Sequence, residues 1–307
     1  MRARAPGKLV LSGAYAVLEG APAIVAAVDR WVEADSARRA PRVTDEVAAA
    51  LGDAGAARAP WFDASALRSG GAHDRKLGLG SSAAIVVASL AALELDASPD
   101  LDDGALAARV LPRALAAHRQ AQRGGSGIDV VASALGGVLR CVRDGEGVAA
   151  TPYPWPTELV TEVWSSGEAA STSALRAEVD ALREARPATY RACLAALARG
   201  AESAASSTSA QGVLDALAAQ AEGLAWLGAE AGAPIVTEGC ARVSALARAE
   251  AAVVLPSGAG GGDVVLHCAL GPSSAAVRGA FERAGFARVP LALGARGVHA
   301  VPTTQGS

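Results

Sequence analysis

A glycine-rich turn that runs directly into a long apolar segment is the feature that most constrains how this chain folds. The turn reads KLGLGSS over residues 76–82, and the run SAAIVVASLAALEL over residues 82–95 predicts a buried helix. Glycines let the backbone turn tightly and approach a ligand closely. The first turn of a helix directs its free N–H groups and its positive dipole end at whatever the turn holds. The segment therefore predicts an anion-binding cradle suited to a polyphosphate.

The lysine of this turn precedes the glycines, so the pattern differs from the phosphate-binding motif G-x-x-x-x-G-K-[ST]. Two serine hydroxyls at the start of the helix can bind phosphate oxygens or a Mg²⁺ ion. An ordinary glycine turn followed by a serine-capped helix is the alternative interpretation. The candidate cofactor-binding residues are Lys76, Gly78, Leu79, Gly80, Ser81, Ser82 and Ala83, of which Ser81 and Ser82 are also candidate metal ligands.

Length and composition exclude several classes of protein. The 307 residues include 51% hydrophobic and 19% charged residues, enough to build one large or two ordinary domains. The net charge is −3 and no basic stretch is long enough to neutralise a run of phosphates, so we expect no nucleic-acid or membrane partner. Four widely spaced cysteines argue against a zinc site and indicate buried, reduced thiols. No window is long and apolar enough to span a bilayer, and a cytoplasmic protein is expected.

Strand and helix patterns are mixed along the chain, which predicts an α+β fold. Strands are expected at residues 8–12, 23–28, 31–34, 138–143, 159–165, 251–255, 264–269 and 286–289, and helices at 44–51, 82–95, 106–122, 129–135, 173–199, 209–231, 239–249 and 273–284. Pro152, Pro154 and Pro156 predict a stiff, extended connection. We place a domain boundary there, giving an N-terminal domain at 1–155 and a C-terminal domain at 156–307.

Three ordered segments of this chain resemble the three motifs of the GHMP kinases. Residues 5–20 (APGKLVLSGAYAVLEG) are similar to the first motif, residues 76–84 to the second, which holds the triphosphate of ATP, and residues 255–264 (LPSGAGGGDV) to the third. The resemblance implies a two-domain fold, with a ribosomal-protein-S5-like N-terminal domain and a ferredoxin-like C-terminal domain. It also implies ATP and Mg²⁺ as cofactors, a small-molecule acceptor as partner, and a monomer or a homodimer.

Within this family, the chain is most similar to the phosphomevalonate kinases. Gly13-Ala-Tyr15 stands where mevalonate kinases usually have G-E-H, and residues 118–130 resemble the signature A-H-x-x-A-Q-…-G-S-G-x-D-V. Residues 164–172 are similar to the W-T-G-x-x-x-S-T segment of the same enzymes. The third motif of those enzymes often begins with lysine, and here that position is Leu255. If the lysine helps to bind a second phosphate, this difference affects the choice of acceptor.

By resemblance, Asp129 is the candidate base that accepts the acceptor's proton, and Lys8 is expected close to it, drawing charge off the transferred phosphoryl group. A helix N-terminal carboxylate and a surface lysine are the plain structural alternatives. His118 is read as structural or weakly substrate-lining. The candidate substrate-binding residues are Tyr15, Ser126, Gly127, Ser171, Thr172, Gly258, Gly260 and Gly261. Any of these residues can instead belong to an ordinary turn.

Phosphoryl transfer from ATP to 5-phosphomevalonate, giving 5-diphosphomevalonate in isoprenoid synthesis, is the leading hypothesis. Mevalonate kinase, or a kinase for a sugar or an amino alcohol, is the alternative on the same fold. A binding protein without turnover is an alternative of a different class. The presence of Lys8, Ser81, Ser82 and Asp129 argues against it, and Leu255 argues weakly for it.

Overall fold

The computed structural model describes residues 1–69, 74–122, 124–145, 147–167 and 171–302, which form two antiparallel sheets and their helices. The first sheet has the order β10-β1-β2-β4-β5, and β3 pairs with β2. Its strands are β1 (Arg2–Ser12), β2 (Ala23–Arg39), β3 (Pro60–Asp63), β4 (Val138–Asp144), β5 (Gly147–Pro152) and β10 (His299–Ala300). Short 3₁₀ helices, η1 (Ala16–Glu19) and η2 (Ser65–Leu67), follow β1 and β3. The mixed α+β fold predicted from the sequence is confirmed.

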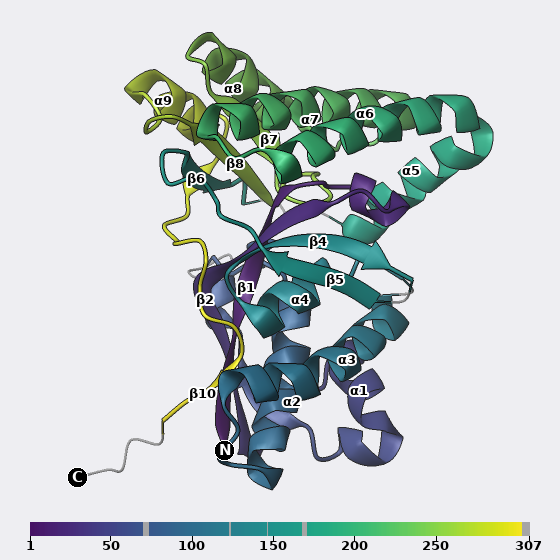
Figure 1. Cartoon of the computed structure of the whole chain (residues 1–307), viewed down its shortest axis with the longest axis vertical. Helices are drawn as coiled ribbons and strands as arrows, with labels where there is room; N and C mark the ends of the chain where they lie inside the picture. Colours follow the sequence, from purple (N-terminus) through teal and green to yellow (C-terminus); the bar gives the residue numbers. More distant parts are fainter. Residues whose placement is uncertain (70–73, 123, 146, 168–170, 303–307) are drawn as a thin grey trace.

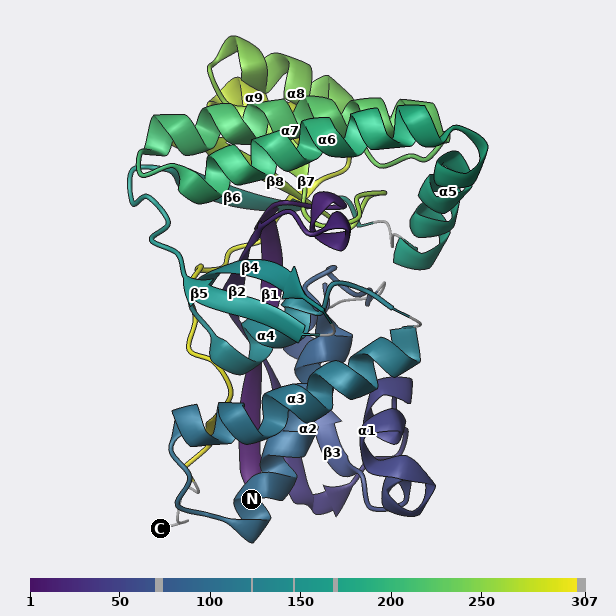
Figure 2. The same ribbon diagram turned by 45° about the vertical axis from the view of Figure 1, so that its right-hand side comes forward.

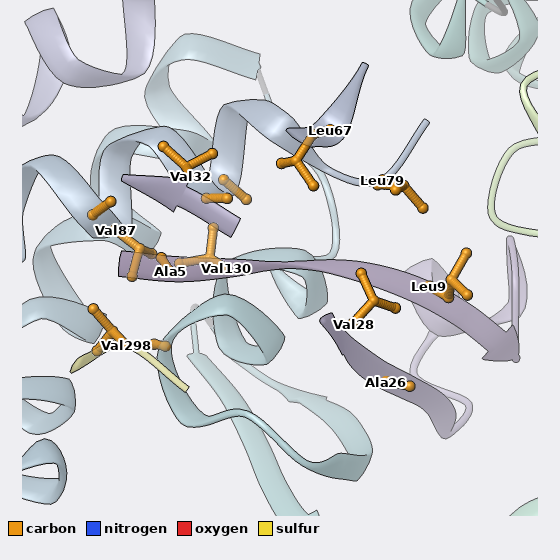
Figure 3. Packing of buried hydrophobic residues seen from close by; sticks show 14 of the residues in the cluster. Ala5, Leu9, Ala26, Val28, Val32, Leu67, Leu79, Val87, Val130 and Val298 are labelled. Carbon is orange, nitrogen blue, oxygen red and sulfur yellow. The ribbon is translucent and has the colours of Figure 1, made fainter. Parts of the chain in front are cut away.

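Four helices gather beside the long strands β1 and β2 (Figure 1). They are α1 (Asp45–Ala56), α2 (Ser81–Ala97), α3 (Asp103–Gln122) and α4 (Ile128–Leu135). Helix α2 is apolar on nearly every side, because it packs against strands on one side and α3 and α4 on others. Figure 3 shows Val87 of α2 and Val130 of α4 beside Ala5 of β1, in a core built of small aliphatic side chains.

The second sheet has the order β7-β8-β6-β9, the strand order of a β-α-β-β-α-β ferredoxin-like unit. Its strands are β6 (Val160–Ser165), β7 (Val253–Pro256), β8 (Val264–Ala269) and β9 (Ala287–Arg288). The helices of this half are α5 (Thr172–Ala185), α6 (Pro187–Ser206), α7 (Ala210–Ala231), α8 (Glu238–Ala249) and α9 (Ala275–Arg283). Trp164 of β6 stacks on Phe281 of α9, with ring centroids 4.3 Å apart, so α9 is fixed to this sheet.

Two predicted boundaries were wrong. The helix expected over residues 173–199 is two helices, α5 and α6, separated at Arg186. Pro187 cannot donate the backbone hydrogen bond that a continuous helix needs there, and it is instead the first residue of α6. The two strands expected at 23–28 and 31–34 form one strand, β2, whose pairing with β1 shifts register between Pro6 and Gly7. Strand β5 was not predicted, and it enters the proline-rich connection as far as Pro152.

The end of the chain returns to the first sheet. Gly294 and Ala295 both donate backbone hydrogen bonds to the carbonyl of Ala27, and β10 pairs with β1. This strap closes a loop that spans nearly the whole chain and ties the C-terminal half to the N-terminal sheet (Figure 1). The division between residues 155 and 156 remains our proposal, with this last segment crossing it.

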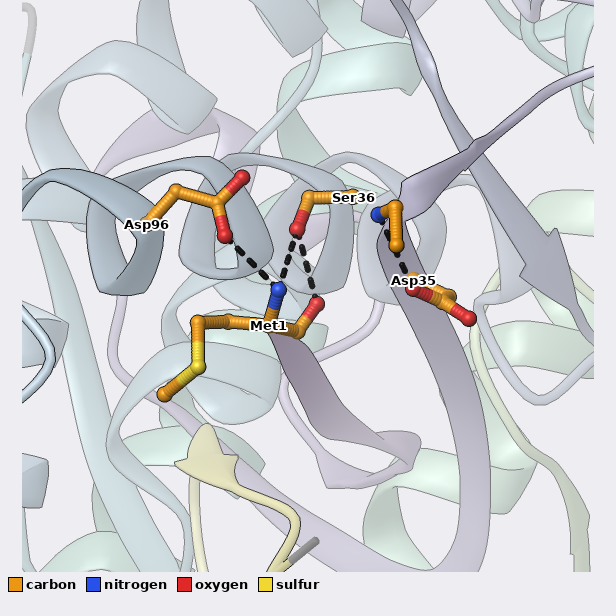
Figure 4. A network of polar contacts seen from close by, with 5 residues as sticks. Met1, Asp35, Ser36 and Asp96 are labelled. Carbon is orange, nitrogen blue, oxygen red and sulfur yellow. Dashed lines mark hydrogen bonds and ion pairs between the residues drawn. The ribbon is translucent and has the colours of Figure 1, made fainter.

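The N-terminal ammonium group is held by a small polar network at the far end of the first sheet (Figure 4). It donates to Ser36 Oγ at 2.6 Å and to Asp96 Oδ1 at 2.7 Å. Burial raises the pKa of Asp96, but hydrogen bonds from the ammonium and Ser36, and the nearby positive charges, outweigh burial and leave the pKa below its usual value. The network fixes the start of β1, the strand that carries Lys8.

The four cysteines are buried and unpaired, as predicted. Burial raises the pKa of the Cys141, Cys240 and Cys268 thiols to about 12, so these thiols are neutral at pH 7. None of the helices in the described ranges has the length and apolar character that crossing a bilayer requires.

Candidate active site

The glycine turn before α2 has the geometry that its sequence predicts. Gly78 and Gly80 adopt left-handed backbone conformations with φ of 69° and 73°. Gly80 is the N-cap residue of α2, and no side chain of the described residues caps the helix. Because no side chain of the described residues accepts a capping hydrogen bond at this end of the helix, its N-terminal N–H groups face the adjacent cavity together with the Ser81 and Ser82 side chains. The geometry favours the anion cradle over the serine-capped helix.

Lys8 lies against this turn. Its backbone N–H donates to the carbonyl of Leu79 at 2.9 Å, which joins β1 to the turn. Its side chain runs over Gly80, where an added Cβ atom would lie 2.9 Å from the Lys8 Cε atom. The missing side chain at position 80 therefore leaves the space through which the Lys8 ammonium enters the cavity.

Asp129 enters the same cavity from the first turn of α4. The helix begins after Gly127, which has φ of 74°, and the Asp129 Oδ1 atom accepts from the Val130 N–H at 3.2 Å. The other oxygen, Oδ2, lies 3.7 Å from Nε2 of His118 on α3. His118 is buried and Asp129 is 24% exposed, so the imidazole lies on the protein side of the carboxylate, beyond hydrogen-bond distance. Lys8 and Asp129 both line one cavity, and the expected close approach of the two side chains stays a prediction.

The third motif closes the cavity from the C-terminal half. The hydroxyl of Ser257 donates to the carbonyl of Val10 at 3.0 Å and accepts from its N–H at 3.0 Å, so the loop is anchored to β1. Tyr15 donates its hydroxyl to the carbonyl of Ala259 at 2.7 Å. Burial, and then the negative charge of Glu178, raise the pKa of Tyr15 well above its usual value, so its hydroxyl keeps its proton. Asp263, from the end of the loop, packs on Gly78.

These segments enclose a cavity of about 490 Å³. His118 lines it, together with twelve of the candidate catalytic, cofactor-binding and substrate-binding residues: Lys8, Tyr15, Lys76, Gly78, Leu79, Gly80, Ser81, Ser82, Ser126, Asp129, Thr172 and Gly258. The hydroxyl and carboxylate oxygens among its lining residues are the hard donors that Mg²⁺ takes. Ser81 and Ser82 thus fit a magnesium site on the chemistry of their side chains. In the described ranges, no cluster of three His, Cys, Asp or Glu side chains forms a separate metal site.

The other predicted site residues take structural positions beside the cavity. Ala83 is fully buried in the helix core, and Ser171 caps α5 by accepting from the Ala174 N–H at 3.3 Å. A Cβ atom on Gly127 would lie 2.8 Å from Leu115, and one on Gly260 would lie 2.2 Å from the carbonyl oxygen of Ile235. Gly261 donates its N–H to that same carbonyl at 3.0 Å. The lining of the cavity includes none of these five residues, and their roles in binding stay predictions.

Sequence reasoning missed three charged residues that line the cavity, Arg75, Arg176 and Asp263. Asp263 follows the glycines of the third motif directly. Arg176 lies four residues after Thr172 and therefore on the same face of α5, which is a signal the sequence contained. Leu255, where related kinases often have lysine, is buried in β7 and packs in the core. A positively charged side chain that binds an anionic acceptor must therefore come from a helix, strand or loop other than β7.

Residues 46–137 match the family described as the GHMP kinases N terminal domain, and this range includes the glycine turn and Asp129. No curated protein sequence matches the chain. The Lin0012 protein from Listeria innocua is similar in structure, with a TM-score of 0.81, 20% identity, and 97% of this chain and 99% of that chain covered.

Two solved structures carry named activities. The Streptococcus pneumoniae phosphomevalonate kinase in complex with phosphomevalonate and AMPPNP has a TM-score of 0.69 and 19% identity, covering 95% of this chain and 99% of that chain. The L. major mevalonate kinase in complex with R-mevalonate has a TM-score of 0.63 and 18% identity, covering 92% of this chain and 90% of that chain. At these sequence identities, the similarity shows a shared fold and does not show a shared substrate. Residues 46–137 thus match the GHMP kinase N-terminal domain family, and the chain as a whole has the fold of these kinases.

Proposed function

We propose that this protein is an ATP-dependent kinase that phosphorylates a small anionic acceptor, with 5-phosphomevalonate as the substrate. One observation carries the proposal: the glycine turn at 76–82 and the carboxylate of Asp129 line one cavity. A kinase needs its phosphate cradle and its acceptor-orienting group to face the same space, because phosphoryl transfer depends on alignment and charge neutralisation. Neither a binding protein nor an ordinary glycine turn requires that arrangement.

In the proposed reaction, an oxygen of the acceptor forms a bond to the γ-phosphorus of ATP, the bond from that phosphorus to the bridging oxygen breaks, and ADP leaves with the bridging oxygen. Lys8 and the first N–H groups of α2 face the negative charge that spreads over the transferred group. Ser81 and Ser82 would hold Mg²⁺, which supplies positive charge to the phosphates when it is bound.

The role of Asp129 depends on the acceptor. An alcohol must lose its proton, and Asp129 is the group in the cavity that can accept it. A phosphate monoester has a second pKa of about 6, so most of it is already deprotonated at pH 7 and Asp129 acts on the remaining fraction. His118, whose Nε2 atom lies 3.7 Å from Oδ2 of Asp129, packs beside the carboxylate in either case.

The choice of 5-phosphomevalonate rests on the sequence segments at residues 118–130 and 164–172 and on the charge of the cavity. Lys8, Lys76, Arg75 and Arg176 all line it, which favours an acceptor that carries negative charge of its own beside the triphosphate. The Streptococcus pneumoniae enzyme of similar fold was solved with phosphomevalonate and an ATP analogue, which is consistent with this choice.

A coupled assay of ADP release tests the proposal. Purified protein is given ATP and Mg²⁺ with mevalonate, 5-phosphomevalonate, galactose or homoserine in separate reactions. We expect release of ADP above the background ATPase rate with 5-phosphomevalonate, and formation of 5-diphosphomevalonate by mass spectrometry. Turnover of mevalonate and of no other acceptor would identify mevalonate, the substrate of mevalonate kinases, as the acceptor in place of 5-phosphomevalonate. The absence of ADP release with every acceptor would favour a binding protein.

A further inference from the structure

A smaller chamber of about 220 Å³ lies beside the cavity of the candidate active site. Five residues line both spaces: Tyr15, Leu18, Gly124, Gly125 and Arg176. None of the turn residues 76–82 is among the described residues that line the chamber. The chamber therefore adjoins the cavity at a part of its lining away from the phosphate cradle, which in the proposed function is the acceptor side.

Arg176 is the charged residue at this junction. It is partly buried, and it forms no ion pair with any residue in the described ranges. Other arginines of the chamber are engaged by the protein: Arg183 pairs with Asp180 at 3.0 Å, and Arg143 donates to the carbonyl of Leu18 at 2.9 Å. A partly desolvated guanidinium without a carboxylate partner is costly unless a ligand supplies the negative charge.

The position of Arg176 is fixed by the packing of α5. Leu175, Val179 and Leu182 are buried in a cluster with residues of α6, so the face of α5 next to Arg176 is anchored. Figure 2 shows α5 reaching from the layer of α6 and α7 towards the N-terminal half of the protein. The guanidinium Nη2 atom lies 3.7 Å from where a Cβ atom on Gly124 would be, in the glycine run that precedes α4. Arg176 is thus pre-organised across the acceptor side of the cavity.

We propose that Arg176 binds the carboxylate at the non-reacting end of the acceptor and makes this kinase selective for acidic acceptors. The inference rests on the proposed function and adds the residue that determines specificity. A planar guanidinium can pair with a carboxylate through two parallel hydrogen bonds, a geometry that a neutral amide of the same shape cannot reproduce. Thr172, one helical turn earlier on α5, offers a hydroxyl on the same face of the cavity.

The test combines a change in the protein with a change in the ligand. Calorimetric titration measures binding of 5-phosphomevalonate and of its C1 carboxamide to the wild-type protein and to Arg176→Gln. The wild-type protein is expected to prefer the acid by about ten- to a hundredfold, as for one charge-assisted contact, and Arg176→Gln is expected to lose that preference. Arg176→Lys keeps the charge without the planar fork and is expected to fall between the two. Arg191→Gln removes one exposed arginine of α6 and should bind like the wild type.

Each outcome separates this inference from the kinase proposal. If Arg176→Gln loses equal affinity for the acid and the amide, or loses none, Arg176 has no role in carboxylate recognition. This conclusion holds whether or not ADP is released. A wild-type protein that binds neither compound also overturns it. A preference for the acid that depends on Arg176, in a protein that releases no ADP with any acceptor, supports the inference and contradicts the kinase proposal.

Discussion

The side chain of Lys8 occupies the space beside Gly80, so that a Cβ atom at position 80 would lie 2.9 Å from both Cγ and Cε of the lysine. The first strand and the glycine turn therefore share one packing arrangement, in which the absence of a side chain on the turn admits the ammonium group. Because of this contact, the position of the Lys8 side chain depends on which residue stands at position 80.

Gly80→Ala is expected to displace Lys8 from the cavity and to lower kcat by at least about tenfold, because the flexible lysine gives way to the new methyl group. The left-handed backbone adds a stability cost of about 1–2 kcal/mol. Gly232→Ala is the matched control, since Gly232 has a similar φ of 66° and no atom within 4 Å of an added Cβ. The control should lose similar stability and keep its kcat. Steady-state kinetics and denaturant unfolding measure both effects, and equal kcat values would contradict the link.

Asp129→Asn is expected to lower kcat by at least about 10²-fold with an alcohol acceptor while the KM for ATP changes little, as for loss of a proton acceptor. With 5-phosphomevalonate the loss of the base should cost at most about twofold at pH 6 and less at higher pH, because the acceptor's phosphate, with a second pKa of about 6, is by then largely deprotonated. Asp100→Asn, an exposed surface change, serves as the control. Near-normal turnover of an alcohol acceptor would rule out the role as proton acceptor, and a large loss with 5-phosphomevalonate that does not depend on pH would indicate positioning alone.

Gly260→Ala is expected to destabilise the protein by about 2–4 kcal/mol, because the new Cβ would lie 2.2 Å from the rigid carbonyl oxygen of Ile235 in a left-handed conformation. At Gly258, which also has positive φ, the nearest atom to an added Cβ is 4.0 Å away. Gly258→Ala should therefore cost only about 1–2 kcal/mol. Urea unfolding measures the loss of stability in both variants. Equal losses would mean that Gly260 is an ordinary loop glycine and has no special packing role.

The buried pair of His267 and Glu162 makes stability depend on pH. Burial lowers the pKa of His267, although Glu162, whose Oε2 atom lies 3.6 Å away, and Glu250 act in the opposite direction. The folded protein thus binds a proton at His267 less readily than the unfolded chain, whose histidines titrate near pH 6.5. Stability is therefore expected to fall as the pH drops below about 6.5, by at most about 1.4 kcal/mol per pH unit from this group.

NMR titration of the His267 imidazole checks this expectation, together with unfolding of His267→Gln between pH 7 and pH 5. The variant should show a shallower loss of stability over that range. An imidazole in the folded protein that titrates above pH 6.5 would contradict the assigned direction.

The parts of the site that the sequence predicted are those fixed by local structure. The turn at 78–80 requires glycine, and the apolar run after it forms a helix in almost any buried setting, so α2 and its exposed N-terminus were predicted. The helix start at Asp129 was predicted from a Gly-Ser-Gly segment before an apolar run, whereas its role as a base came from the family resemblance. The break at Pro187 was also local, and it was missed because the alanine-rich pattern continues on both sides of the proline.

The sequence by itself determined the α+β class, the phosphate-binding turn and the family likeness, because each depends on neighbouring residues. Only the tertiary structure decided that Ser257 meets Val10, that the last strand returns to β1, and that Arg176 lies over Gly124 at the mouth of a second chamber. Those contacts join segments from about 50 to nearly 300 residues apart. They depend on how whole sheets and helices pack, and the periodicity of one segment contains no information about which distant segment will cover it.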